Sequence, residues 1–290
     1  MILYPPEIQT LLRSMYGEEG RAYHGMNHIK YLLTKAREYF SQDYDVTLWN
    51  LVQHAIWWHD AWYSIFERQG RNEMESAALF SELHTQGKFT LDIPGMSEDE
   101  AAGHVWQAIQ TTARHLEDID FTDKTLWGHD TIGRKLSMLM MDVDLAGFAE
   151  DLDMVKHHSE LVLKEYAPLG KSREALLEGR IAFLTKLLER KRIFYTNYFY
   201  ETCEKKARAN LQASIEDTQE ELESLRTPEP ESIFELPVFT PRDALNRKRF
   251  TNHAGLKGWA IRGYNGSWRL DFDDGTSWHV SDIDNLTIED

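Results

Sequence analysis

The sequence contains a single cysteine, Cys203, among its 290 residues. One thiol cannot form a disulfide bond within the chain, so we expect the protein to work in the reducing cytoplasm. Long apolar runs are also lacking. No basic segment followed by an apolar stretch opens the chain, and the run at 138–141 ends at Asp142 and Asp144. We therefore expect neither a signal peptide nor a membrane span.

Positive charge is scarce, because 32 Lys and Arg residues stand against 48 Asp and Glu residues and leave a net charge of -16. This balance opposes sequence-independent binding to the phosphates of a long nucleic acid or to an anionic membrane surface. A small phosphate compound remains compatible with it, because a metal ion and a few arginine or lysine side chains can meet its charge locally.

Most of the chain has a helical pattern. From Ile8 to about Leu225 the apolar residues recur at helical spacing, with breaks at clusters of Gly, Pro and Asp. The segments 178–188 and 198–225 are typical of long amphipathic helices. The sequence therefore predicts a mainly α-helical domain over residues 1–226, and the chain is long enough for a small second domain.

The composition changes after this domain. Four prolines between positions 228 and 241 favour an extended connection, which we place at 227–254. Beyond it, apolar and polar residues alternate, and Asn-Gly at 265–266 and Asp-Gly at 274–275 are typical hairpin turns. We therefore predict a small antiparallel β module at 255–290.

Two histidine motifs carry the clearest chemical signal. His24 and His28 are four residues apart, so on a helix they lie on one face. The doublet His59-Asp60 ends an apolar run, where a charged carboxylate is costly unless it is paired or binds a cation. Together they indicate a metal site. The alternative is a pair of ordinary histidines beside an Asp that caps a neighbouring helix.

A third element is the pair Asp142 and Asp144, which interrupts another apolar helix. Only one of these carboxylates can point the same way as the buried face that carries Leu139 and Met140. The pattern alone does not choose between them, although we expect Asp142 to lie on the polar edge of the helix.

The order His28, His59-Asp60, Asp144 resembles the HD superfamily of metal-dependent phosphohydrolases. The similarity is closest to a bacterial and phage family of predicted HD phosphohydrolases and runs over about residues 8–215. Further matching pieces are Arg21-Ala22-Tyr23-His24, Asn72-Glu73, Thr112 with His115, Glu165-Tyr166, Gly179-Arg180 and Glu204 with 207–211. The sequence departs from the pattern in a longer loop between His115 and Asp144, in Lys164 where an arginine is usual, and in the added β module.

The resemblance implies a helical HD domain whose metal ligands are His28, His59, Asp60 and Asp144. Two imidazoles and two carboxylates suit Mn, Fe, Co, Ni or Zn better than Mg, and we expect one ion rather than two. Such an ion can deliver hydroxide to phosphorus. A similar histidine pair in cyclic nucleotide phosphodiesterases implies that His24 is the general acid.

Other candidate residues are less fixed. Asn72 with Glu75 fits a helix cap, whereas the resemblance turns Glu73 toward the site, to orient water or to hold His59. His115 has three possible roles, which are phosphate contact, ligand of a second metal, or core histidine. We also predict substrate phosphate contacts from Arg21 and Lys164, with Arg114 and Arg180 as further candidates.

These features predict a metal-dependent phosphohydrolase that acts on a small phosphate ester, with a nucleotide favoured. One alternative is a di-iron oxygenase of the same fold, with extra ligands from His84 and His115. Another is a protein without turnover that binds a metal or nucleotide. The β module is the predicted site for a protein partner or for self-association.

Overall fold

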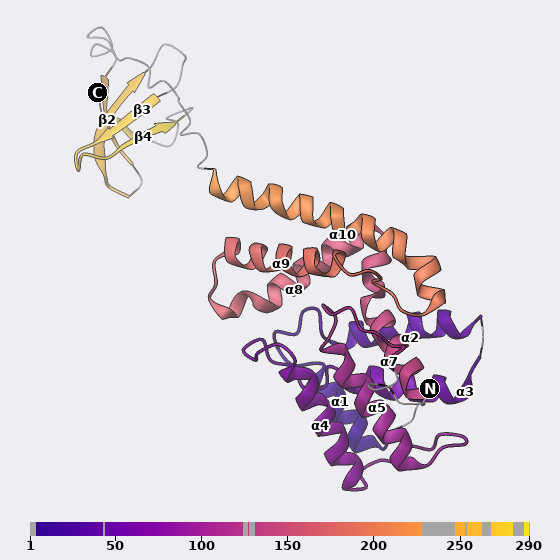
Figure 1. The fold of residues 1–290 in the computed structure, drawn as a ribbon. Helices are drawn as coiled ribbons and strands as arrows, with labels where there is room; N and C mark the ends of the chain where they lie inside the picture. Colours follow the sequence, from indigo (N-terminus) through magenta and orange to yellow (C-terminus); the bar gives the residue numbers. More distant parts are fainter. Residues whose placement is uncertain are drawn as a thin grey trace. The chain divides into compact units, whose positions relative to one another are not determined.

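The computed structural model describes residues 4–42, 44–123, 127, 131–227, 247–252, 254–262, 268–280 and 287–289. The chain divides into two compact units, Met1–Arg226 and Thr227–Asp290. The described part of the first unit is helical and that of the second carries the strands (Figure 1). The predicted fold class, mainly α with a small antiparallel sheet at the C-terminal end, is confirmed.

The helical unit follows the predicted apolar periodicity. Its helices and 3-10 turns run in chain order as α1 (Pro6–Met15), α2 (Met26–Phe40), α3 (Val46–Trp58), α4 (Arg71–Thr85), α5 (Glu98–Thr112), α7 (Thr131–Leu145), η1 (Ala146–Ala149), α8 (Leu152–Tyr166), η2 (Ala167–Leu169), α9 (Arg173–Leu188) and α10 (Asn197–Arg226).

Helix α3 is the central element of this unit. It contacts α2, α4, α5 and α7, and Leu51, Val52, Ala55 and Ile56 are fully buried on it. Asp45 caps its start, because the carboxylate accepts a hydrogen bond from the backbone N–H of Leu48. Because α3 packs against four other helices, its position in the unit is fixed by its neighbours. The residues that follow its C-terminal end are therefore held in place as well.

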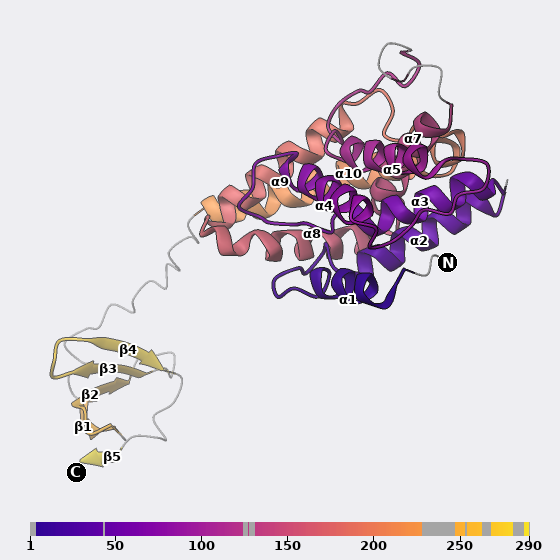
Figure 2. The same cartoon turned by 90° about the horizontal axis from the view of Figure 1, so that it is seen from below.

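The second group of helices comprises α8, α9 and α10. Helix α10 contacts α8, α9 and η1, and α8 contacts α9 and η1 (Figure 2). Helix α7 runs directly into η1, so its end lies where the two groups meet. Asn210 of α10 fixes the chain there by donating hydrogen bonds to the carbonyl oxygens of Phe148 and Glu150.

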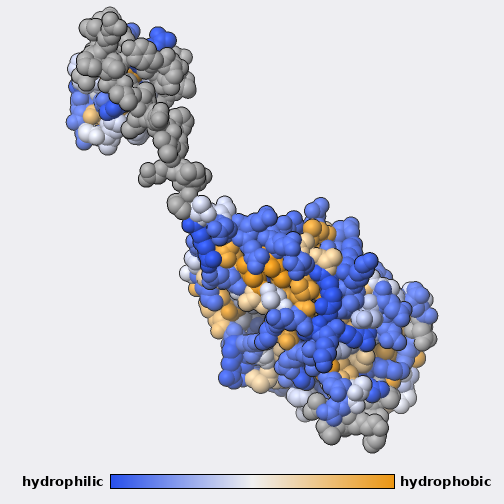
Figure 3. Space-filling view, turned by 45° about the horizontal axis from the view of Figure 1, so that its top comes forward, coloured by the Kyte–Doolittle hydropathy of each residue, from blue (hydrophilic) through white to orange (hydrophobic). Residues whose placement is uncertain are grey.

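The surface of the helical unit is largely polar. Hydrophilic residues cover most of the face in Figure 3, and apolar residues gather in smaller patches between them. Among the helices that the structure describes, none has both the length and the apolar character needed to cross a lipid bilayer.

The second unit holds an antiparallel sheet whose described strands lie in the order β4-β3-β2-β1-β5. The strands are β1 (Arg247–Thr251), β2 (Lys257–Arg262), β3 (Trp268–Phe272), β4 (Ser277–Val280) and β5 (Thr287–Glu289). Phe250, Ala260, Leu270 and Phe272 form its small core.

Two sequence predictions for this unit are corrected or refined. Strand β1 lies inside 227–254, so the prediction that this whole segment is a connection and that the module starts at 255 is wrong. Phe250 explains the difference, because it supplies a fully buried core side chain. The turn at 274–275 joins β3 to β4, and Gly275 has the positive φ of 90° that favours glycine. The Asn-Gly pair at 265–266 lies outside the described residues.

Candidate metal and phosphate site

Three helices bring His28, His59 and Asp144 together. His28 lies in the first turn of α2, His59 follows α3, and Asp144 is near the end of α7. Each offers one ligand atom, and these atoms all lie within 4.8 Å of one another. Asp144 Oδ1 is 3.1 Å from His28 Nε2 and 3.7 Å from His59 Nε2. The three side chains can hold a metal ion, as the sequence predicted for them.

The orientation of His59 supports this use. Its Nδ1 lies 2.9 Å from the carbonyl oxygen of Ile56 and therefore carries the proton. Its Nε2 is buried, faces the carboxylates and has no hydrogen-bond partner. An imidazole that donates through one nitrogen to a carbonyl and presents the other nitrogen bare to carboxylates has the arrangement of a metal ligand. The donor set therefore fits a divalent cation.

Asp60 lies beside this cluster. Its Oδ2 is 2.9 Å from His59 Nε2 and 3.8 Å from His28 Nε2, and the residue is only 8% exposed. The carboxylate thus contacts two of the three cluster residues, in the apolar surroundings that the sequence indicated.

Arg21 does not contact the cavity, so its predicted role as a substrate contact is wrong. Its guanidinium donates hydrogen bonds to the carbonyl oxygens of Asp60 and Ala61, at 2.7 and 3.0 Å. It also pairs with Glu18 and lies over the ring of Tyr16. Its charge is used to hold the turn after α3, which positions Asp60.

The charges in the cluster reinforce one another. Burial alone would raise the pKa of Asp60 and of Asp144, but His59 outweighs it and holds both pKa values well below their ordinary range. Burial alone would likewise lower the pKa of His59, but the charges of Asp60 and Asp144 raise it well above its ordinary value. A proton and a metal ion would therefore compete for the buried Nε2 of His59.

His24 is held by a buried carboxylate, Glu165. His24 Nδ1 is 2.7 Å from Glu165 Oε2, and Glu165 Oε1 accepts from the backbone N–H groups of Tyr23 and His24. The ring of His24 stacks on Tyr63. Burial opposes the charged imidazole, but the bond with Glu165 and the charge of Asp60 raise the pKa of His24. The ring is thus fixed and suited to carrying a proton.

Glu73 and His115 line the same cavity. His115 Nε2 is 2.7 Å from Asp144 Oδ2. This nitrogen is thus bonded to a carboxylate, and not to a backbone carbonyl as in an ordinary core histidine. Glu73 Oε2 is buried without a hydrogen-bond partner, and burial followed by the charges of Asp60 and Asp144 raises its pKa. Glu73 does not hold His59, whose Nδ1 is bonded to Ile56 instead.

The predicted cap of α4 by Asn72 is wrong. Gly70 occupies the position before the helix, and Asn72 instead exchanges hydrogen bonds with the backbone of Ser64. Glu75 pairs with Arg71. Asn72 therefore ties down the segment between α3 and α4, which forms part of the cavity wall.

Asp142 is fully buried and not on the polar edge that we predicted for it. It accepts hydrogen bonds from the backbone N–H of Tyr195 and from the N–H and hydroxyl of Thr196, at 2.6 to 2.7 Å. Its carboxylate thus holds the chain that enters α10. Asp142 therefore stabilises the fold, whereas Asp144 belongs to the cluster that can hold a metal ion.

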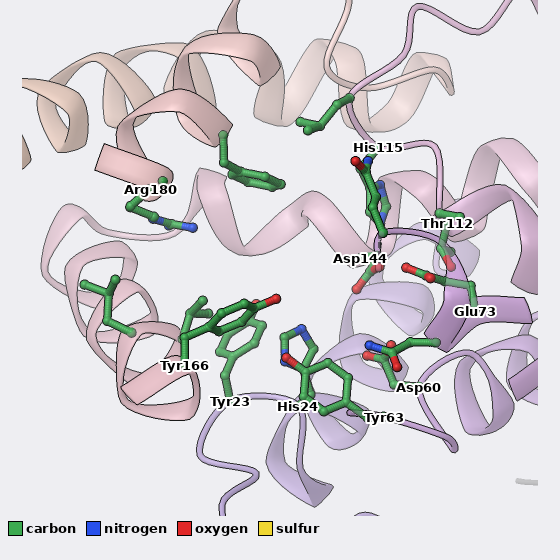
Figure 4. Close-up of a pocket in the computed structure, with 18 of the residues that line it drawn as sticks. Tyr23, His24, Asp60, Tyr63, Glu73, Thr112, His115, Asp144, Tyr166 and Arg180 are labelled. Atoms are coloured by element: carbon green, nitrogen blue, oxygen red, sulfur yellow. Dashed lines mark hydrogen bonds and ion pairs between the residues drawn. The ribbon is translucent and has the colours of Figure 1, made fainter. Parts of the chain in front are cut away.

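The cluster opens into a cavity of about 500 Å³. His24, Asp60, Glu73, His115 and Asp144 line one side of it, and Arg180 reaches in from the opposite side (Figure 4).

Lys164 is exposed on α8 and is not among the lining residues, so its predicted phosphate contact is wrong. Arg180 is the candidate whose side chain does lie in the wall. His84 also lies outside the cavity, where it pairs with Glu98.

Sequence reasoning did not give Glu165 a role and did not prefer Arg180. Both have the same signal, a charged residue inside an apolar helical stripe. Glu165 follows Val155 and Val162 on α8, and Arg180 lies between Leu176 and Phe183 on α9. A charge at such a position requires a partner, whether in the protein or in a ligand.

No family model matches the sequence, and no curated protein is significantly similar to it. The resemblance to the HD superfamily therefore remains a prediction from the order and spacing of the motifs.

Proposed function

We propose that the protein is a metal-dependent phosphohydrolase of the HD type that acts on a small phosphate ester, with a nucleotide as the favoured substrate. The observation that carries the proposal is that a cluster able to hold a metal and a carboxylate-anchored imidazole face the same cavity. The motif order of the sequence supports the same conclusion.

In this proposal His28, His59, Asp60 and Asp144 hold one divalent transition-metal ion. Such an ion supplies a Lewis acid and lowers the pKa of bound water to near neutrality. The two carboxylates are ionised because histidines adjoin them, and the Nε2 of His59 faces both of them. These residues match the ligand preferences of Mn, Fe, Co, Ni or Zn.

The chain itself supplies the proton transfers. His24, protonated and oriented by Glu165, donates a proton to the leaving oxygen of the ester. Glu73 has a buried oxygen without a partner and a raised pKa, which suit a group that takes a proton from the attacking water. His115 holds Asp144 through its second oxygen and borders the substrate.

The size of the cavity supports a nucleotide-sized substrate, because about 500 Å³ falls in the range of small-molecule pockets. The alternative di-iron reaction is weakened by His84, which lies outside the cavity. We further propose a cytoplasmic location, and a protein partner or second copy at the β unit, where Trp259 and Trp278 are 40% and 58% exposed.

The test is a phosphate-release screen on purified protein over nucleotides, sugar phosphates and p-nitrophenyl phosphate, with each of the five metals added in turn. We expect phosphate release that requires one of these metals, stops with a chelator and returns when the metal is restored. If the protein binds the metal at a 1:1 ratio and releases phosphate from no compound, the proposed function is wrong.

A further inference from the structure

The cavity extends from the metal cluster to a second region between α8 and α9. We call this second region the distal compartment. Its wall is formed by Phe148 of η1, Val155 and Val162 of α8, and Leu176 and Phe183 of α9. Apolar side chains of this kind fit the uncharged body of a ligand.

Arg180 of α9 is the charged group that lies among these apolar side chains, and Lys171, which is exposed, also lines the cavity. Its guanidinium lies over the rings of Phe148 and Phe183, at 5.6 and 5.7 Å from their centroids. Its Nη2 donates to the hydroxyl of Ser159, and its buried Nε has no hydrogen-bond partner. Within the described part of the chain, no carboxylate forms an ion pair with it. Burial lowers the pKa of Arg180 only to about 10, so the group stays charged at neutral pH.

A guanidinium in this setting is costly unless an anion meets it. The metal cluster does not meet it, because the carboxylates of Asp60 and Asp144 are already matched by histidines. Tyr23 lines the same cavity, and its ring lies against His24 and His28, at 4.9 and 5.0 Å between ring centroids. The arrangement therefore offers two places for negative charge in one cavity, one at the metal and one at Arg180.

We infer that Arg180 binds a second oxyanion of the substrate, distinct from the phosphoryl group at the metal, and that the distal compartment takes the uncharged body of the same molecule. This inference rests on the proposed function. The substrate class is a phosphate compound with two acidic groups. The second group is either the neighbouring phosphate of an anhydride or a separate acid elsewhere on the molecule.

Kinetics with Arg180→Gln test the assignment. The substrates are a nucleoside monophosphate, the matching diphosphate and the matching 3′,5′-bisphosphate, with p-nitrophenyl phosphate as a compound with one phosphate only. We expect KM to rise about 10- to 100-fold for the compound with the correctly placed second acid, with kcat nearly unchanged, and to change less than about threefold for p-nitrophenyl phosphate. The diphosphate and bisphosphate arms distinguish the two sources.

Lys164→Gln is the matched control, because it removes one positive charge from an exposed position of α8 that does not line the cavity. Arg180→Lys keeps the charge but loses the fork of donors, so we expect an intermediate rise in KM. Equal changes for compounds with one and two acidic groups in Arg180→Gln would overturn the inference.

Gly179 allows a separate test of the distal compartment. It lies in the wall on α9, and a Cβ built there meets no atom within 4 Å. A side chain at Gly179 therefore starts in open space, and we expect Gly179→Leu to occupy part of the compartment and to favour the helix. Gly103→Leu is the control, because Gly103 is an exposed glycine of α5 with equally open space, outside the cavity wall.

Binding of inorganic pyrophosphate to the metal-loaded protein, measured by calorimetry, does not depend on turnover. We expect Arg180→Gln to weaken it about 10-fold or more and Gly179→Leu to leave it unchanged, while Gly179→Leu raises KM for nucleotides. Unchanged pyrophosphate affinity in Arg180→Gln, together with an unchanged KM for the bisphosphate, would refute the anion site. Unchanged nucleotide KM in Gly179→Leu would refute the compartment. Intact binding in a protein that hydrolyses nothing would count against the proposed function alone.

Discussion

The two ends of the cavity differ in how their charges are matched. At the metal end, Asp60 and Asp144 face His28, His59 and His115 at 2.7 to 3.8 Å. In the distal compartment, the guanidinium of Arg180 contacts the hydroxyl of Ser159 and two aromatic rings, and it forms no ion pair with a carboxylate of the described residues. In the proposed function the difference separates two tasks. The protein itself fixes the groups proposed to perform the chemistry, whereas the charge of Arg180 is left to be met by the proposed substrate.

The largest effect is expected at α7, where Asp144 and Asp142 stand two residues apart. Asp144→Ala removes a cluster residue, so we expect loss of bound metal and a fall in activity of about 10³-fold or more. Asp142→Ala leaves three buried donors without an acceptor, so we expect metal retention with a loss of about 3 kcal/mol in unfolding free energy. Metal analysis and denaturant unfolding measure both. The same metal content in wild type and Asp144→Ala contradicts the site.

A smaller effect is expected at His24, which serves proton transfer at the metal end. His24→Ala should keep the metal and lower kcat by about 10² to 10⁴. Glu165→Gln should lower kcat less, by about 10-fold, because the imidazole remains but is held less firmly.

The pH dependence of Glu165→Gln gives the sign of the interaction. The bond with Glu165 favours the imidazolium, so its loss lowers the pKa of His24 and the acid loses its proton at lower pH. The alkaline limb of the kcat/KM profile should therefore move to lower pH. A limb that stays in place would mean that His24 is not the general acid.

These results also show which parts of the site can be predicted from sequence. His28 and His59 are found because imidazoles beside a carboxylate inside apolar helices have few other uses, whereas Asp144 was chosen over Asp142 only through the family resemblance. Asp142 and Asp144 stand in equivalent local patterns, and only the tertiary contact of Asp142 with Thr196 separates their roles.

Arginines and lysines are harder to place from sequence. Arg21 and Lys164 are charged residues near motif histidines or carboxylates, yet one holds the turn after α3 and the other is exposed. Long side chains reach several neighbours, so proximity along the chain does not fix their contacts. The periodicity of the apolar residues predicted the helices. Strand β1 was missed because the prolines that precede it led us to predict a connection over the whole segment.

The smallest effect is expected from removing residues 227–290. The described residues that line the cavity all belong to 1–226. The chain 1–226 should therefore retain its kcat and KM for a small phosphate ester within about twofold. A stable, helical 1–226 that has lost activity would assign the β unit a part in the chemistry.

Arg21 affects the proposed metal site through its contacts with the turn after α3. Its side chain is only 4% exposed, and it clamps the turn that carries Asp60 through contacts made wholly within the protein. The position of Asp60 is thus fixed by the protein itself, in contrast to small domains that fold only when they bind metal. We therefore expect metal-free protein to keep its helices, and we expect one divalent ion to replace another at the proposed site without unfolding of the chain.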